Sequence, residues 1–236
     1  MFNEIICYHP DRVNEICNPR RLLPRTRIRR STDAVTNARK NKRQQRSEAT
    51  RRLLLEVSLE LFVRHGFAGT TVRAIARKAK ISPGLMFHYF PSKQALLEEH
   101  AAVVQRGIDH VVSLLESSKA PMETFDAIAR LILQSFAHSY GKNLFLLANQ
   151  VLSIDTIPAS VKAKVSPTKS IDASIPLIRK GQRQGQIRAG DATALAVAFW
   201  GALQGIAEIL VWNPRMPVPE CNCITAILWG PRSDLD

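Results

Sequence analysis

Residues 82–93 read SPGLMFHYFPSK, and this stretch decides how the first half of the chain folds. Pro83 suits the first position of a helix, where its missing N–H would have no partner, and Ser82 before it is a good N-cap. Pro91 ends the same helix, and Ser92 caps the one that follows. The stretch therefore predicts a short helix held between two prolines, with Met86 available for a core.

A second short helix precedes this one. The segment GTT at 69–71 provides a turn and a cap for VRAIARKA at 72–79, whose small apolar side chains face inward. Only Lys80-Ile81-Ser82 separates the two helices. Two short helices joined by a tight turn form a helix-turn-helix, whose second helix enters the major groove of DNA.

The rest of the chain predicts helices throughout. A first helix begins at Ser47 as N-cap and stops at Gly66. A long helix follows Ser92, with an apolar stripe at helical spacing from Leu97 to Leu115. Further helices are expected at about 122–139, 143–154, 158–165, 170–184 and 191–212. Because no strand pattern of useful length appears, the predicted class is all-α.

The two ends of the chain differ from this helical middle. Residues 1–52 hold 14 Lys and Arg against 5 Asp and Glu, within a formal net charge of +13 for the 236-residue chain. Residues 1–46 lack apolar periodicity and are predicted to be a mostly disordered basic arm, unless translation starts further downstream. Residues 214–236 form a proline-rich tail that is expected to be irregular, although its ITAILW run has the composition to pack locally.

Several functional classes find no support in the residues. The four cysteines lie near the ends and lack paired zinc-site spacing, so we expect a reducing cytoplasm, no metal and no cofactor. No apolar run is expected to approach a membrane span. Phosphate loops and nucleophile motifs are missing, which argues against an enzyme. His65, His100, His110 and His138 are read as structural or exposed.

The stretch TTVRAIARKAKISPGLMFHYFPSKQALLEE, with FVRHGF before it, resembles the DNA-binding domain of the TetR/AcrR family of bacterial transcriptional regulators. A weaker resemblance covers IRKGQRQGQIRAGDATALAVAFWGALQGI. The resemblance implies a homodimer whose recognition helices enter successive major grooves of a near-palindromic operator. It also implies a C-terminal helical bundle with a pocket for a small effector that releases the DNA.

The resemblance also assigns contacts by position. Residues at phosphate-contacting positions are Thr71, Phe87, His88 and Lys93. Residues at positions that make base or close backbone contacts are Arg73, Ser82, Pro83, Gly84 and Leu85. Two departures stand out: Phe87 replaces the usual Tyr and loses its hydroxyl, and Lys80 occupies a turn position that is commonly Gly.

Four segments are therefore expected: the arm at 1–46, the helix-turn-helix domain at 47–107, an effector and dimerisation domain at 108–213, and the tail at 214–236. Aromatic candidates for the effector pocket are Phe136, Phe145 and Trp200, each of which also suits a core. Small residues on the last helix suit either a dimer seam or packing within the chain.

The predicted function is a sequence-specific regulator, most simply a repressor. The alternative is a protein that binds nucleic acid or anionic membranes non-specifically through its basic arm. The sequence does not identify the effector, the operator or the regulated genes. It also does not show whether the protein represses or activates transcription.

Overall fold

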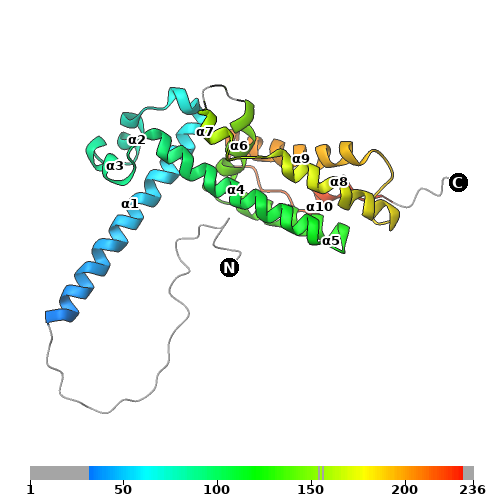
Figure 1. Cartoon of the computed structure of the whole chain (residues 1–236), viewed down its shortest axis with the longest axis horizontal. Coiled ribbons are helices and arrows are strands. Elements are labelled where there is room, and N and C mark those ends of the chain that lie inside the picture. Colours follow the sequence, from blue (N-terminus) through cyan, green and yellow to red (C-terminus); the bar gives the residue numbers. More distant parts are fainter. Residues whose placement is uncertain (1–31, 154, 156, 231–236) are drawn as a thin grey trace, which may run out of the picture.

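The computed structural model of the chain describes residues 32–153, 155 and 157–230, which form helices and no strand (Figure 1). The predicted all-α class is confirmed for this part of the chain. The helices are α1 (Thr32–Gly69), α2 (Val72–Lys78), α3 (Pro83–Tyr89), α4 (Lys93–Ser117), α5 (Pro121–Phe136), α6 (Ser139–Ser153), α7 (Ala159–Lys162), α8 (Thr168–Arg183), α9 (Ala192–Trp212) and α10 (Asn222–Thr225).

Helix α1 begins earlier than the sequence pattern suggested. It starts at Thr32, so Ser47 lies inside the helix and does not cap it, and the last part of the expected disordered arm is helical. Residues 32–46 are rich in Ala, Arg, Lys and Gln, which favour helix even without an apolar stripe, and no proline interrupts them. In Figure 1 this half of α1 projects away from the other helices. The prediction for residues 1–31 lies outside the described residues.

The caps of the helix-turn-helix follow the prediction. Gly66 breaks the path of α1 with a positive φ of 72°, a conformation that glycine adopts without strain. Thr71 caps α2 by accepting a hydrogen bond from the N–H of Ala74, at 3.1 Å. Ser82 and Ser92 cap α3 and α4 in the same way, at 3.1 and 3.0 Å.

Two hydrophobic cores lie along α4, whose buried side chains belong to the first core up to Ile108 and to the second from Val111 onward. The first joins the helix-turn-helix to α6 and α7, with Leu147 and Val161 packed in the same cluster as Leu54 and Met86. The second fills the bundle of α5, α8 and α9. Helix α4 contributes buried side chains to both, because its stripe runs unbroken from Leu97 to Leu115. The DNA-binding end and the bundle are therefore packed into each other through α4 and α6.

The C-terminal tail joins the second core instead of standing apart from it. Helix α10 places Ile224 in this core, Leu228 is fully buried beside it, and the carbonyl of Leu228 accepts a hydrogen bond from the N–H of Arg188 at 2.9 Å. The proline-rich segment before α10 is irregular, as expected, and the ITAILW run packs locally, as its composition allowed; residues 231–236 lie outside the described residues. The apolar positions of ITAILW explain the local packing, since their burial stabilises a segment with little helical content.

Helix α9 corrects the expectation that no apolar run approaches a membrane span. Its 21 residues have a mean hydropathy of 1.8 over an 18-residue window, of which 33% is buried, so it is long and apolar enough by composition alone. Yet α9 packs along α6 and α8 as part of the helical bundle. Its hydropathy is high because apolar side chains lie on its outward face as well as on its buried face.

The close approach of the start of α6 to the end of α5 depends on Gly141, the third residue of α6. A Cβ there would lie 2.3 Å from the carbonyl oxygen of Ser135, a distance that only a backbone shift relieves. We expect Gly141→Ala to lower the free energy of unfolding by about 1–3 kcal/mol, the usual cost of overpacking. Urea denaturation of both proteins measures the change, and Gly69→Ala is the control because a Cβ there has ordinary contacts. Equal midpoints for Gly141→Ala and the wild type would contradict the prediction.

Candidate DNA-binding interface and ligand pocket

The outer face of α3 carries more apolar surface than an isolated surface helix requires. Leu85 and Phe87 are 41% and 50% exposed, and Gly84 and His88 are exposed beside them. On the opposite face Met86 is fully buried and Phe90, just after the helix, is almost so. Seven residues are too few for a stable isolated helix, so the buried side anchors α3 while its outer face stays open to a partner.

The sequence reasoning placed nine residues at the DNA, and the structure brings most of them to one end of the molecule. Those on the exposed surface of α2 and α3, with the turn between them, are Thr71, Arg73, Ser82, Pro83, Gly84, Leu85, Phe87 and His88. Two of these already have a structural role, since Thr71 and Ser82 use their side-chain oxygens as helix caps. Their hydroxyl hydrogens remain available to donate to a phosphate oxygen.

The basic side chains of α2 separate into two groups. Lys78 forms an ion pair with Glu60 of α1, with 2.6 Å between its Nζ and the carboxylate oxygen, which ties α2 to α1. Arg73 and Arg77 are exposed, and the described residues provide no ion pair for either guanidinium. Arg73 and Arg77 are therefore the α2 side chains with a guanidinium available for DNA.

Lys80 adopts the left-handed conformation that its turn position demands. Its φ is +56°, and it is the only non-glycine with positive φ among the described residues. A left-handed residue with a Cβ costs roughly 1–2 kcal/mol, which glycine avoids.

We expect Lys80→Gly to raise the free energy of unfolding by up to about 1 kcal/mol, because the relief of strain exceeds the extra entropy of glycine in the unfolded chain. Thermal unfolding of both proteins tests this. Arg106→Gly serves as the opposite control, since Arg106 is exposed inside α4, which packs in both cores, and its replacement should destabilise. A lower melting temperature for Lys80→Gly would contradict the expectation.

Lys93 is the ninth of the residues that the sequence assigned to DNA. Its ammonium is already hydrogen-bonded within the protein, whereas a simple phosphate contact needs a free one. Its Nζ donates hydrogen bonds to the carbonyl oxygens of Phe67 and Thr70, at 2.6 and 2.7 Å, and lies 4.2 Å from the centre of the Phe67 ring. Partial burial lowers the pKa of this ammonium from its ordinary value. Lys93 therefore fastens the start of α4 to the turn between α1 and α2. The motif could not reveal this role, because both carbonyls come from residues more than twenty positions away.

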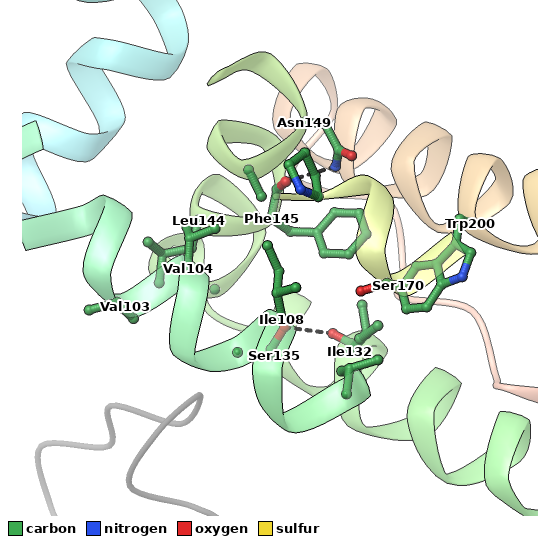
Figure 2. A pocket seen from close by; sticks show the side chains of 15 residues that line it. Val103, Val104, Ile108, Ile132, Ser135, Leu144, Phe145, Asn149, Ser170 and Trp200 are labelled. Carbon is green, nitrogen blue, oxygen red and sulfur yellow. Dashed lines mark hydrogen bonds between the residues drawn. The ribbon is translucent and has the colours of Figure 1, made fainter. Parts of the chain in front are cut away.

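A pocket of about 120 Å³ opens between α4, α5, α6, α8 and α9 (Figure 2). Phe145 and Trp200, two of the three aromatic candidates, line it. Phe136 does not: it is 1% exposed and packs edge-on against the Phe145 ring, with 5.3 Å between ring centres. Spacing alone could not separate these roles, because both aromatics face the bundle. Figure 2 shows the Phe145 and Trp200 rings directed into the same space from α6 and α9.

A buried polar contact between the DNA-binding end and the bundle was missed by sequence reasoning. His100 of α4 is fully buried, and its Nε2 lies 3.0 Å from Ser58 Oγ of α1. Its Nδ1 lies 3.4 Å from the hydroxyl of Tyr140 on α6. Burial lowers the pKa of His100 from 6.5 to about 3, so the ring is neutral near pH 7. No local motif marks these residues, which are about forty positions apart.

Comparison with known proteins agrees with this geometry. Residues 54–100 match the family described as bacterial regulatory proteins, tetR family. The HTH-type transcriptional regulator RutR of Escherichia coli strain K12 is 28% identical over 174 residues, which cover 71% of this chain and 78% of RutR. BetI of Agrobacterium fabrum, also an HTH-type transcriptional regulator, is 37% identical over 87 residues, covering 36% and 42% of the two chains.

Solved structures share the fold. The TetR family transcriptional regulator PfmR of Thermus thermophilus has a TM-score of 0.57 at 19% identity, covering 74% of this chain and 96% of PfmR. AibR in complex with isovaleryl coenzyme A and operator DNA has a TM-score of 0.57 at 18% identity, covering 77% and 99%. The helix-turn-helix at residues 54–100 therefore matches the model for bacterial regulatory proteins of the tetR family, the fold is shared with solved TetR family regulators, and together these matches support a DNA-binding transcriptional regulator.

Proposed function

We propose that the chain is a homodimeric repressor that binds a near-palindromic operator and leaves it when a small molecule enters the pocket. It acts in the cytoplasm and has no catalytic activity of its own. The observation that carries the proposal is the exposed face of α3, where Leu85 and Phe87 remain open on a helix that is otherwise anchored in a core.

The DNA contacts divide by chemistry. We assign base or close backbone contacts to Arg73, Ser82, Pro83, Gly84 and Leu85. Arg73 carries a guanidinium that can bond two acceptors of a guanine, and Leu85 offers a surface that suits a thymine methyl group. Phosphate contacts fall to Thr71, His88 and, by van der Waals contact alone, Phe87. Phosphate contacts fix the position of α3 on the duplex, and base contacts select the sequence.

A second copy of the chain accounts for the outer face of α9. Val197, Ile209 and Trp212 are exposed there, Trp212 by 79%, and a Cβ at Gly201 or Gly205 would meet nothing within 4 Å. An apolar face of this length with small residues lets another helix approach closely. Pairing through α9 places two copies of α3 on one duplex, which a palindromic operator requires.

Release of DNA follows from the position of α4. The same helix starts beside the helix-turn-helix at Lys93 and lines the pocket from Val103 to Val111. A ligand that moves α4 at the pocket also moves the attachment of α2 and α3. Such a ligand lowers DNA affinity only if it binds the displaced arrangement more tightly than the DNA-bound one.

Binding of the full chain to the DNA upstream of its own gene tests the proposal. Fluorescence anisotropy with this duplex and a scrambled duplex, at several salt concentrations, should show a preference of about a thousandfold or more for the native sequence. Equal and steeply salt-dependent affinity for both duplexes would instead favour the basic arm as the binding element.

Removal of residues 1–31 separates the two possibilities further, because it leaves α1 whole. The shortened chain should keep its sequence preference and lose only non-specific affinity. Loss of the preference with the arm would count against recognition by α3.

Lys93 provides a test of how the interface is held together. We expect Lys93→Met to lower the free energy of unfolding by about 1.5–3 kcal/mol, because the carbonyl oxygens of Phe67 and Thr70 lose hydrogen bonds from a charged donor. Operator affinity should fall while the slope of log K against log salt stays unchanged, because no phosphate contact is removed.

Arg73→Met is the matched variant, because it removes an exposed cation proposed to reach the duplex and should lower the slope. If the slope of log K against log salt fell in Lys93→Met by about one for each protomer, Lys93 would be a phosphate contact after all.

A further inference from the structure

The pocket lining contains no charged side chain. Its 15 residues come from five helices and the segment before α8, and none is Asp, Glu, Lys, Arg or His. Polar side chains are limited to Ser135, Asn149, Ser170 and the indole of Trp200. An ionised ligand group placed here would lose its hydration without gaining a counter-ion, which costs far more than the burial of a neutral group.

Most polar hydrogens of the lining are already bonded within the protein. Ser135 Oγ donates to the carbonyl of Ile132 at 2.6 Å, and Asn149 Nδ2 donates to the carbonyl of Phe145 at 2.9 Å. Trp200 Nε1 donates to Ser174 Oγ at 3.0 Å. Figure 2 shows the first two of these groups turned toward their own helices. Only the second N–H of Asn149 and the hydroxyl of Ser170 remain as donors, and neither carries a charge, so an anionic ligand finds no counter-ion here.

Two polar groups remain for a ligand. The side chain of Asn149 keeps its oxygen as an acceptor and the second hydrogen of its nitrogen as a donor, since only one N–H bonds Phe145. Ser170 is the lining residue whose side-chain hydroxyl has no described acceptor, and it is 6% exposed. A single ligand hydroxyl can donate to the first or accept from the second. The polar capacity of the pocket therefore suits one hydroxyl on an otherwise apolar molecule.

The size of the cavity limits the ligand further. The volume is about 120 Å³, and an apolar cavity of about 150 Å³ holds one benzene molecule. Phe145 and Trp200 present rings to the space, and aromatic ligands pack well against such rings edge-on or offset. A ligand with one ring, or a branched chain of similar bulk, is therefore at the upper limit of size for this pocket.

We propose that the effector pocket takes a small uncharged molecule with one ring or branched chain and a single hydroxyl, and rejects ionised molecules of the same size. This inference rests on the proposed function for its regulatory meaning, but the binding itself is measured without DNA. Nucleotides and coenzyme A esters, with their phosphates, fall outside this class.

Four probes of matched size test the charge requirement on the full chain. Toluene, benzyl alcohol, benzoate and benzylammonium share one ring and differ in the attached group. Isothermal calorimetry or ligand-detected NMR should show saturable binding of benzyl alcohol and toluene, with benzyl alcohol the tighter. Benzoate and benzylammonium should bind at least about 100-fold more weakly, because an unpaired charge is buried. Ions bound as tightly as benzyl alcohol, or no saturable binding of any probe, would overturn the proposal.

A substitution at Gly107 tests the position of the binding site from the side of the protein. It lines the pocket, and a Cβ there would meet nothing within 4 Å, so a larger side chain has space. Gly107→Leu should abolish binding of benzyl alcohol without lowering stability, because leucine is a better helix former than glycine.

Ser113→Leu, on the exposed side of the same helix, should bind benzyl alcohol like the wild type. If Gly107→Leu bound benzyl alcohol as the wild type does, the probe would bind outside this pocket and the proposal would be wrong. Because DNA is absent from these measurements, a failure here is distinct from a failure to bind the operator.

Discussion

A glutamate at position 84 is expected to abolish operator preference while leaving the fold intact. Gly84 is exposed in the first turn of α3, and the nearest atom to a Cβ there is Ser82 Oγ at 4.0 Å. The free protein therefore has room for any side chain at this position. A carboxylate near the first turn of a helix also interacts favourably with the helix dipole, so the melting temperature should stay the same or rise.

The loss appears only in the complex. If α3 lies in the major groove, its first turn is close to base edges and phosphates, and a carboxylate there is repelled and desolvated. We expect the preference for the native over the scrambled duplex, about a thousandfold or more in the wild type, to disappear. Anisotropy titrations with both duplexes measure this directly.

Two variants separate bulk from charge. Gly84→Ala tests whether the backbone itself must approach the duplex, and Gly84→Gln adds the volume of glutamate without its charge. The expected order of operator affinity is wild type, then alanine, then glutamine, then glutamate. A Gly84→Glu protein that keeps full preference would show that α3 does not enter the groove and would end the assignment of this face.

Local chemistry explains which parts of the fold could be predicted from the sequence. The caps at Thr71, Ser82 and Ser92 are confirmed because each acts on an N–H three residues later. The stripe on α4 is confirmed because its 4-3-4 spacing places every member on one helix face. The left-handed turn at Lys80 is also local, and it was indicated by the family resemblance, in which glycine is common at this position.

The features that the sequence pattern misplaced or left open depend on contacts between distant residues. The start of α1 was misplaced because an amphipathic stripe was required, whereas residues 32–46 form helix through propensity on a helix already anchored further along. Phe136 and Phe145 have similar surroundings in the sequence, and only the fold turns one to the core and the other to the pocket. The site assignments themselves remain predictions, to be settled by the DNA titrations.

The buried contact at His100 joins the three helices that must move together if the pocket controls DNA binding. Ser58 lies on α1, His100 on α4 and Tyr140 on α6, one residue before Gly141 at the wall of the pocket. Phe62 packs against the His100 ring edge-on, with 6.2 Å between centres. Among the described residues that contact this ring there is no carboxylate to stabilise a positive charge.

We therefore expect protonation of His100 to contribute to the pH dependence of the free energy of unfolding. Its pKa is about 3 in the folded chain and 6.5 when exposed, so between these values the unfolded chain binds the extra proton. Stability from the neutral ring is fully present above pH 6.5 and is lost as pH falls toward 3, by at most about 1.4 kcal/mol per pH unit. Between pH 7 and pH 4.5 this amounts to a loss of about 2–3 kcal/mol.

His100→Gln isolates the effect, because glutamine is neutral at every pH and its amide can still bond Ser58. Partial burial also lowers the pKa of His110, and the carboxylates titrate in this range, but these groups are common to both proteins. The difference in unfolding free energy between wild type and variant, from urea titrations at half-unit steps, should therefore shrink as pH falls from 6.5 to 4.5. A difference that stays constant over this range would mean that His100 is accessible to protons in the folded chain, and that the contact joining α1, α4 and α6 opens readily.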